Sequence, residues 1–437
     1  MRFALPKVAT APFCPSEVRG TVAVGPGLTP WAKAMRFAGP GLLVAVGYVD
    51  PGNWATDIES GARYGYDLLF VIAFCGLAAV LLQWLSMRLG IVAERDLARL
   101  ARDHYSPAAS RFLWLLAEIA IIATDVAEVL GSALAFNLLL GVPLWLGVLL
   151  TALDTLIVLG LKGTGFRQVE AIIAGLVATI AICFIAQLIL APPSGSGILH
   201  GLTPQLGRLN QPHALYLAVG ILGATVMPHN LYLHSSIVQT RSTEGQGGKR
   251  DALRFATVDI VAALMIAAFL NGAILVLAAA TFHASGHVGV ADIEDAYHLL
   301  EPITGASAAA VLFAIALFAS GQSATFTGTI AGQVILEGFL NLKIPCWQRR
   351  VITRGLALLP AMIGVLWLGD HAVGRLLVLT QVVLALQLPF ALWPLIRFSS
   401  DRAIMGPFAI GPVARLAAWG IFGLIVAANL WLIMQAG

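Results

Sequence analysis

The chain has 437 residues, of which 59% are hydrophobic and only 11% are charged, and its mean hydropathy is +0.86. This composition excludes an ordinary soluble globular protein, in which about a quarter of the residues carry a charge. The formal net charge of +3 and the lack of a basic tract with interleaved aromatic residues give no indication of a nucleic-acid partner.

The N-terminal segment, residues 1–37, differs from the rest of the chain. It contains several prolines and basic residues but no uninterrupted apolar stretch of the signal-peptide type. We therefore expect a flexible cytoplasmic tail and not a cleaved leader.

Apolar runs of about 20 residues follow, the length that an α-helix needs to cross a hydrocarbon core of about 30 Å. Backbone groups in lipid must form hydrogen bonds within their own segment, so these runs should be helices. The pattern predicts an all-α integral membrane protein with eleven spans, at residues 38–64, 67–91, 112–136, 142–161, 168–191, 214–239, 255–281, 304–336, 351–369, 373–396 and 409–434.

The orientation in the membrane follows from the loops. Basic residues gather on alternate loops, on the side of the N-terminal tail: Arg95, Arg99, Arg102, Lys162, Arg167, Arg241, Lys249, Arg250, Lys343, Arg349, Arg350, Arg397 and Arg402. The opposite loops hold almost none, with Arg208 as the clearest exception. The positive-inside rule therefore places the N-terminus in the cytoplasm and, with an odd number of spans, the C-terminus outside.

The first span is interrupted by Asp50-Pro51-Gly52-Asn53. A carboxylate at bilayer depth costs about 3 kcal/mol on insertion scales, so Asp50 needs a reason to be there. One interpretation is that Asp50 only caps the half-helix that begins at Pro51. The other is a cation site, because a broken helix exposes backbone carbonyls that can join a carboxylate and an amide around an ion.

The third span carries Asp125 and Glu128, three residues apart and so on one helical face. Two carboxylates in an apolar stretch cannot both be ionised cheaply, so one of them could hold a transferable proton. The structural alternative is a hydrogen-bonded cluster that only fixes this span to its neighbours.

The sixth span is interrupted by Met227-Pro228-His229-Asn230. A thioether is a poor ligand for Mg²⁺ or Ca²⁺ but an acceptable one for softer first-row ions, although a methionine in an apolar helix usually serves packing. His229 and His234 follow the break, and histidine is the side chain best suited to change its charge near neutral pH, although buried histidines are often only hydrogen-bond partners. Thr225 before the break and Asn271 in the seventh span could form a hydrogen bond that steadies the opened backbone.

The two interrupted spans are an odd number of spans apart, so they cross the membrane in opposite directions. A matched pair of broken spans indicates an inverted-repeat transporter with its site near the midplane. Chance is the alternative explanation, since proline is frequent in membrane helices.

Three segments resemble the signature motifs of the Nramp family of divalent metal transporters. They are the two interruptions, extended to Ala224-Thr225-Val226-Met227-Pro228-His229 in the sixth span, and Gly321-Gln322-Ser323-Ala324-Thr325-Phe326-Thr327-Gly328-Thr329-Ile330-Ala331-Gly332-Gln333. The resemblance extends from about residue 35 to the last span and favours the bacterial eleven-span, proton-dependent manganese transporters. It implies the LeuT-type fold, with two inverted five-helix repeats in residues 38–396, followed by a connecting loop and an eleventh helix in residues 397–437.

The resemblance also implies roles for individual residues. The metal ligands would be Asp50, Asn53, the Ala224 carbonyl and Met227, joined by Gln381 in some conformations. Asp50, Asp125, Glu128 and His229 would belong to a proton route, with His234 as a further candidate and Arg354 as an exit partner. The expected function is import of Mn²⁺ or Fe²⁺, with Cd²⁺, Co²⁺ and Zn²⁺ as further ions, across the bacterial inner membrane, by a monomer without a resident cofactor.

Three other classes of function fit the sequence less well. A carrier of the same fold for an organic solute would present free backbone amides to a carboxylate, which Asp50 would repel. An intramembrane hydrolase would need H-E-x-x-H, G-x-S-x-G or paired catalytic aspartates on facing spans, and none occurs. A channel or receptor would not need a matched pair of breaks. The sequence therefore predicts a transporter and not an enzyme.

Overall fold

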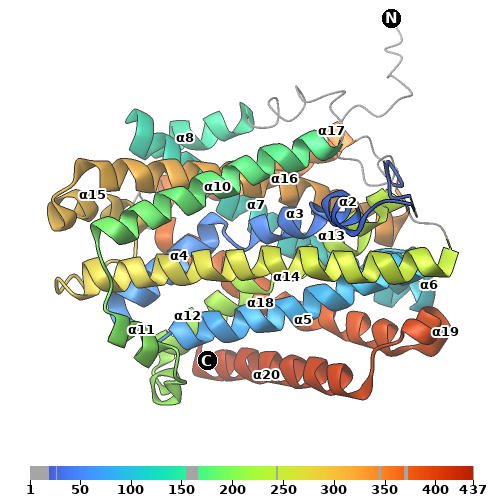
Figure 1. Ribbon diagram of the computed structural model, residues 1–437. Coiled ribbons are helices and arrows are strands. Elements are labelled where there is room, and N and C mark those ends of the chain that lie inside the picture. Colours follow the sequence, from blue (N-terminus) through green and yellow to red (C-terminus); the bar gives the residue numbers. More distant parts are fainter. Residues whose placement is uncertain are drawn as a thin grey trace, which may run out of the picture.

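The computed structural model describes residues 19–25, 27–153, 166–242, 245–342, 346–368 and 373–436. Within these residues, 8 helices are long and apolar enough to cross a membrane. They lie side by side in one bundle (Figure 1). The chain is thus a multi-pass integral membrane protein, as its composition predicts.

The helices follow the predicted spans. The first span is the pair α3 (Pro40–Gly47) and α4 (Pro51–Tyr64), and the sixth is the pair α12 (Pro212–Thr225) and α13 (Pro228–Ile237). The second, third, fourth and fifth spans correspond to α5 (Leu69–Ala93), α7 (Pro107–Leu140), α8 (Leu144–Leu150) and α10 (Phe166–Leu190). The seventh to eleventh correspond to α14 (Gly245–Ala278), α16 (Ser307–Leu340), α17 (Cys346–Leu368), α18 (Val373–Ser400) and α20 (Pro412–Ala436). From residue 154 onward, the predicted fourth span lies outside the described residues.

Short elements occupy the connections. Helices α6 (Leu97–His104), α11 (Gly195–Gly201), α15 (Ile293–Thr304) and α19 (Arg402–Met405) lie between spans. Single turns occur at η1 (Thr151–Leu153), η2 (Leu206–Asn210), η3 (Val238–Thr240), η4 (Ala279–His283) and η6 (Gly406–Phe408). Strand β1 (Val22–Ala23) pairs in parallel with β2 (Arg241–Ser242), and α2 (Pro30–Phe37) precedes the first span. Regular structure therefore begins within the predicted tail, of which residues 1–18 lie outside the described residues.

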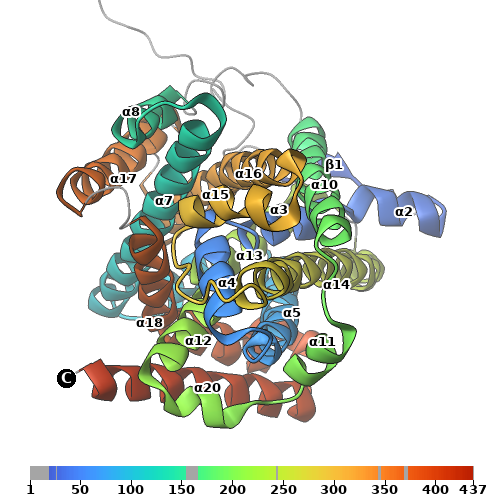
Figure 2. The ribbon, with the colours of Figure 1, turned by 90° about the vertical axis from the view of Figure 1, so that its left-hand side faces the viewer.

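Each broken span restarts at a proline. Pro51 and Pro228 are the first residues of α4 and α13, where the missing backbone N–H costs nothing and the fixed φ favours the first turn. Both breaks lie inside apolar runs, so the peptide groups around them are shielded from lipid only if other helices surround them. In Figure 2, α4 and α13 lie near the centre of the bundle, with α5, α7, α10, α14, α16 and α18 around them.

Burial separates the central spans from the peripheral ones. The most apolar window of the sixth span is 94% buried within the protein, whereas that of the eleventh is 17% buried. The eleventh span, α20, contacts mainly α18 and α12 and lies along one edge of the bundle (Figures 1 and 2). In the first span, all residues of α4 from Pro51 to Ala62 are buried as well. Protein therefore surrounds the interruptions of both the first and the sixth span.

A glycine on α7 allows the first break to pack closely. A Cβ placed on Gly131 would overlap the ring of Pro51, whereas a Cβ on Gly175 of α10 would meet no atom within 4 Å. We expect Gly131→Ala to lower the free energy of unfolding by about 1–3 kcal/mol through overpacking. Gly175→Ala is the matched control and should leave stability unchanged or slightly raised. Thermal unfolding of the two purified variants measures the difference, and equal midpoints would contradict the close packing at Pro51.

Candidate metal-binding site

Asp50 sits at the break of the first span with its two carboxylate oxygens in different environments. Its Oδ1 accepts hydrogen bonds from the backbone N–H and the side-chain Nδ2 of Asn53, both at 2.8 Å. Its Oδ2 is buried and has no hydrogen-bond partner among the described residues. Capping of α4 therefore accounts for one oxygen and leaves the second available to a ligand.

Asn53 joins the two broken spans. Its Nδ2 also donates to the Ala224 carbonyl at 3.2 Å and to the Gly47 carbonyl at 3.4 Å. The Asp50 carboxylate and the backbone carbonyls of Gly47 and Ala224 thus all contact the side-chain amide of Asn53. Oxygen atoms gathered in this way can also surround a cation, with the Asn53 amide as a further ligand.

Met227 is fully buried at the start of α13. Its Sδ accepts a hydrogen bond from Asn230 Nδ2 at 3.5 Å and faces Gly47, where an added Cβ would lie 3.2 Å from the sulfur. The thioether therefore faces the last turn of α3, which also supplies the Gly47 carbonyl to Asn53. The two breaks therefore meet through the hydrogen bond from Asn53 to the Ala224 carbonyl and through the contact of Met227 with Gly47.

Gln381 reaches the first break from α18. A Cβ on Gly52 would overlap its side-chain amide, so Gln381 lies directly against the start of α4. The amide Nε2 donates to Thr380 Oγ1 at 3.0 Å, while Oε1 is buried without a hydrogen-bond partner among the described residues. The structure thus places the Gln381 side chain against the break of the first span, next to the segment that carries Asp50 and Asn53.

One predicted contact is wrong. Thr225 and Asn271 do not bond to each other: Thr225 Oγ1 has no hydrogen-bond partner among the described residues, and Asn271 Nδ2 donates to Asn53 Oδ1 at 3.1 Å. Asn271 therefore orients the candidate ligand Asn53 and not the opened backbone of the sixth span.

The opened backbone of the first span is supported by a residue that sequence reasoning did not single out. Ser320 on α16 donates from Oγ to the Val49 carbonyl at 2.5 Å, satisfying a carbonyl that the break leaves without a helical partner. Its position directly before the motif that begins at Gly321 is the signal that could have identified it.

The two acidic residues of the third span share one face, as predicted. A Cβ on Gly328 of α16 would lie 2.7 Å from Glu128 Oε1 and 3.3 Å from Asp125 Oδ1, so both carboxylates point at this glycine. Arg354 is buried and donates to the Thr151 carbonyl at 3.1 Å and 3.3 Å. Glu128 also precedes Gly131 by one turn of α7, and Gly131 packs against Pro51, so the carboxylate pair lies near the first break.

The two histidines of the sixth span point to different neighbours. His229 Nδ1 lies 3.3 Å from Oγ1 of Thr124, the residue next to Asp125 on α7. His234 Nδ1 lies 3.0 Å from Gln83 Oε1, and Gln83 Nε2 donates to the Tyr48 hydroxyl at 2.8 Å. His229 thus contacts the third span, while His234 is linked through Gln83 of α5 to Tyr48, the residue that follows α3. Gln83 and Tyr48 are additions that the sequence did not predict.

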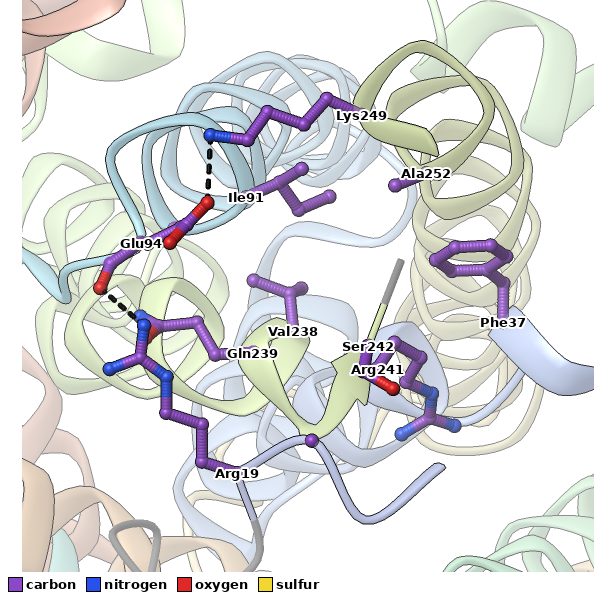
Figure 3. Close-up of a pocket in the computed structure, with 12 residues that line it drawn as sticks. Arg19, Phe37, Ile91, Glu94, Val238, Gln239, Arg241, Ser242, Lys249 and Ala252 are labelled. Carbon is purple, nitrogen blue, oxygen red and sulfur yellow. Dashed lines mark hydrogen bonds and ion pairs between the residues drawn. The ribbon is translucent and has the colours of Figure 1, made fainter. Parts of the chain in front are cut away.

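A separate cavity of about 210 Å³ lies beside β2 and contains none of the predicted site residues (Figure 3). Glu94 bridges its rim: the carboxylate pairs with Lys249 at 2.8 Å, and the backbone carbonyl accepts from Arg19 at 2.9 Å. The hydrogen bond from Lys249 holds the pKa of Glu94 below its usual value. This cavity is lined mainly by the ends of elements and is distinct from the site at the two breaks.

No group of three or more His, Cys, Asp or Glu side chains that could hold a metal occurs among the described residues. A site at the breaks would therefore combine one carboxylate with amide, carbonyl and thioether donors. Such a mixed set binds less tightly than a structural metal site, which suits an ion that must also leave.

Comparison with known proteins places this arrangement in a family. Residues 41–435 match the Nramp family, described as natural resistance-associated macrophage protein-like. A divalent metal cation transporter, MntH, of Ralstonia nicotianae is 62% identical over 433 residues, covering 99% of this chain and 98% of the relative. The family and its relatives are transporters, which confirms the prediction that the chain is not an enzyme.

Solved structures agree with the sequence comparison. The manganese transporter of Eremococcus coleocola, in complex with an aromatic bis-isothiourea substituted compound, is 37% identical with a TM-score of 0.88 over 96% of this chain and 90% of its own. MhsT in complex with L-phenylalanine is 15% identical with a TM-score of 0.62 over 91% of this chain and 98% of its own, and shares the fold alone. These likenesses confirm the predicted LeuT-type fold, and together with the family match they show that the chain belongs to the Nramp family of transporters.

Proposed function

We propose that the chain imports divalent transition metal ions, Mn²⁺ or Fe²⁺ with Cd²⁺, Co²⁺ and Zn²⁺ as further substrates, by alternating access coupled to protons. The observation that carries the proposal is the convergence of Asp50, Asn53, the Ala224 carbonyl and Met227 where the two broken spans meet. The relative from Ralstonia nicotianae is named as a divalent metal cation transporter and the one from Eremococcus coleocola as a manganese transporter.

The donor set favours transition metals over alkaline-earth ions. Mg²⁺ and Ca²⁺ prefer oxygen ligands only, and Mg²⁺ also gives up its water reluctantly. A thioether beside a carboxylate and carbonyls is better matched to Mn²⁺, Fe²⁺ and softer first-row ions. We assign Gln381 as a further ligand, because its side-chain amide lies against Gly52 at the same break and its Oε1 is buried without a hydrogen-bond partner among the described residues.

The carboxylate pair supports the proton half of the proposal. Asp125 and Glu128 are buried side by side, and a like charge disfavours ionisation of both. A dication that arrives at Asp50 favours the ionised form of that carboxyl, so its binding would release the Asp50 proton toward Asp125 and Glu128. Arg354, which stays charged, would be the exit partner and not a proton acceptor. His229 joins this route through Thr124, and His234 forms a second candidate branch through Gln83.

We further propose a monomer in the bacterial inner membrane with a cytoplasmic N-terminus and an external C-terminus. The basic residues of alternate loops support this orientation. In it, an inside-negative potential favours entry of each positive charge by about 2.3 kcal/mol per 100 mV.

Mn²⁺ uptake into proteoliposomes with internal pH recorded alongside tests the proposal. We expect metal entry to be accompanied by acidification of the interior, because proton and metal would move in the same direction. Liposomes without protein control for leakage, and an amino acid in place of Mn²⁺ tests the organic-solute alternative. Metal entry without acidification would remove the proton half of the proposal, and no metal entry would remove both halves.

A further inference from the structure

The connection between α18 and α20 forms a basic pocket at the end of the molecule that also carries α2 and α6 (Figure 1). The pocket has a volume of about 380 Å³, and Arg402 and Arg415 are its charged lining residues. Both side chains are exposed, and neither guanidinium forms an ion pair or hydrogen bond with another described residue. The adjacent Asp401 is occupied as a helix cap, accepting from the Ala403 N–H at 2.8 Å. Two positive charges therefore line a hollow without a protein counter-charge bonded to them.

The loop that forms this pocket is held in place. Arg88 on α5 donates to the Phe408 carbonyl at 2.6 Å, and the Ile410 N–H donates to the Ser399 carbonyl at 3.1 Å. The shape of the pocket is thus fixed by contacts that do not involve the two arginines.

A second, apolar cavity of about 350 Å³ lies along the same helices, between α7, α18 and α20. Its lining is almost entirely aromatic and aliphatic: Tyr105, Ala109, Phe112, Leu113, Pro389, Phe390, Trp393, Pro394 and Phe422. Trp393 and Phe422 form one wall, with ring centroids 5.9 Å apart.

The two cavities follow one another along α18 and α20. Trp393 and Ser400 are seven residues apart on α18, and Arg415 and Phe422 are seven apart on α20, so each pair lies on one helical face about 10 Å apart. The basic pocket is at the facing ends of α18 and α20, and the apolar cavity lies further along both helices, at Trp393 and Phe422. This order matches a phospholipid, with its phosphate at the membrane surface and its acyl chains below.

We propose that the two cavities together bind one anionic phospholipid of the cytoplasmic leaflet. Arg402 and Arg415 would contact the phosphate, since basic pockets between spans on the cytoplasmic side recognise anionic head groups. The apolar cavity would hold an acyl chain, which a free phosphate ion lacks. The choice of leaflet rests on the orientation proposed above, whereas the binding itself does not depend on metal transport.

Lipid binding to the full-length protein in detergent, followed by native mass spectrometry, tests this proposal. We expect phosphatidylglycerol to bind more tightly than phosphatidylcholine, and the double variant Arg402→Ala/Arg415→Ala to bind phosphatidylglycerol about 30-fold more weakly, since each arginine near an anionic surface contributes about fivefold. The matched control Arg95→Ala/Arg254→Ala removes two exposed arginines elsewhere at the same end of the bundle and should bind as the unmodified protein does.

A second variant probes the apolar cavity. Ala109 is exposed at the start of α7 and lines this cavity, so Ala109→Phe fills it without removing a core contact. We expect it to weaken phosphatidylglycerol binding while both arginines remain. Inorganic phosphate should fail to displace the lipid at equal concentration.

Three outcomes would overturn the proposal: undiminished phosphatidylglycerol binding by the double arginine variant, equal binding of phosphatidylcholine, or displacement of the lipid by inorganic phosphate. Mn²⁺ uptake is measured separately, with the unmodified protein in proteoliposomes. Absence of uptake there would count against the proposed transport function and not against the lipid site.

Discussion

Replacing Asp50 by asparagine is expected to abolish Mn²⁺ uptake while leaving the protein folded. Asparagine caps helices as well as aspartate does, so the hydrogen bonds to Asn53 at the start of α4 can be kept. What is lost is the one negative charge among the five proposed ligands. Removing one partner of a buried charge pair costs about 3 kcal/mol or more, which lowers metal affinity by more than about 100-fold. Asp50→Ala should give the same loss of uptake, together with loss of the cap.

The measurement is Mn²⁺ uptake into proteoliposomes, with metal binding by calorimetry and the thermal unfolding midpoint recorded for each variant. Asp401→Asn is the matched control, because Asp401 also caps a helix but lies at an exposed position away from the breaks. Near-normal uptake by Asp50→Asn would mean that Asp50 is only a cap, and the proposed metal site would have to be abandoned.

Replacing Met227 by alanine is expected to change which ions are accepted. Without the thioether, the remaining donors at the two breaks are oxygen atoms, which Ca²⁺ and Mg²⁺ prefer. We expect Mn²⁺ uptake to persist at a reduced rate and Ca²⁺ to compete about tenfold better than in the unmodified protein, a shift of ~1.4 kcal/mol in relative affinity. Competition of Mn²⁺ uptake by excess Ca²⁺ or Mg²⁺ measures this shift.

Met265→Ala is the control, since Met265 is 51% exposed on α14 whereas Met227 is fully buried. Because a buried methionine leaves a cavity when truncated, the Met227 variant can lose about 2–5 kcal/mol of stability, and its folded fraction must be measured before rates are compared. If alkaline-earth ions are still rejected by folded Met227→Ala, the sulfur is not the basis of selectivity.

The sequence by itself determined where the membrane helices lie and where two of them break. A proline lacks the N–H that continues a helix, so the restarts at Pro51 and Pro228 are local chemistry that no distant contact is needed to explain. The predicted ends of the spans are less accurate: α14 begins at Gly245 and not near residue 255, and α16 ends at Leu340 and not at 336. Hydropathy indicates which residues lie within the hydrocarbon core. A helix can continue beyond the core with polar residues, so its ends are not visible in the hydropathy pattern.

Only the tertiary structure decided which side chains meet at the breaks. The sequence suggests a hydrogen bond between Thr225 and Asn271. Because α14 packs against α4, Asn271 instead donates its hydrogen bond to Asn53. The support of Val49 by Ser320 and the link from His234 through Gln83 to Tyr48 likewise join residues far apart in the chain. The physical reason is that a local pattern fixes which backbone groups lose their helical partners, whereas the groups that replace those partners come from other helices, whose relative rotation and depth depend on packing across the whole bundle.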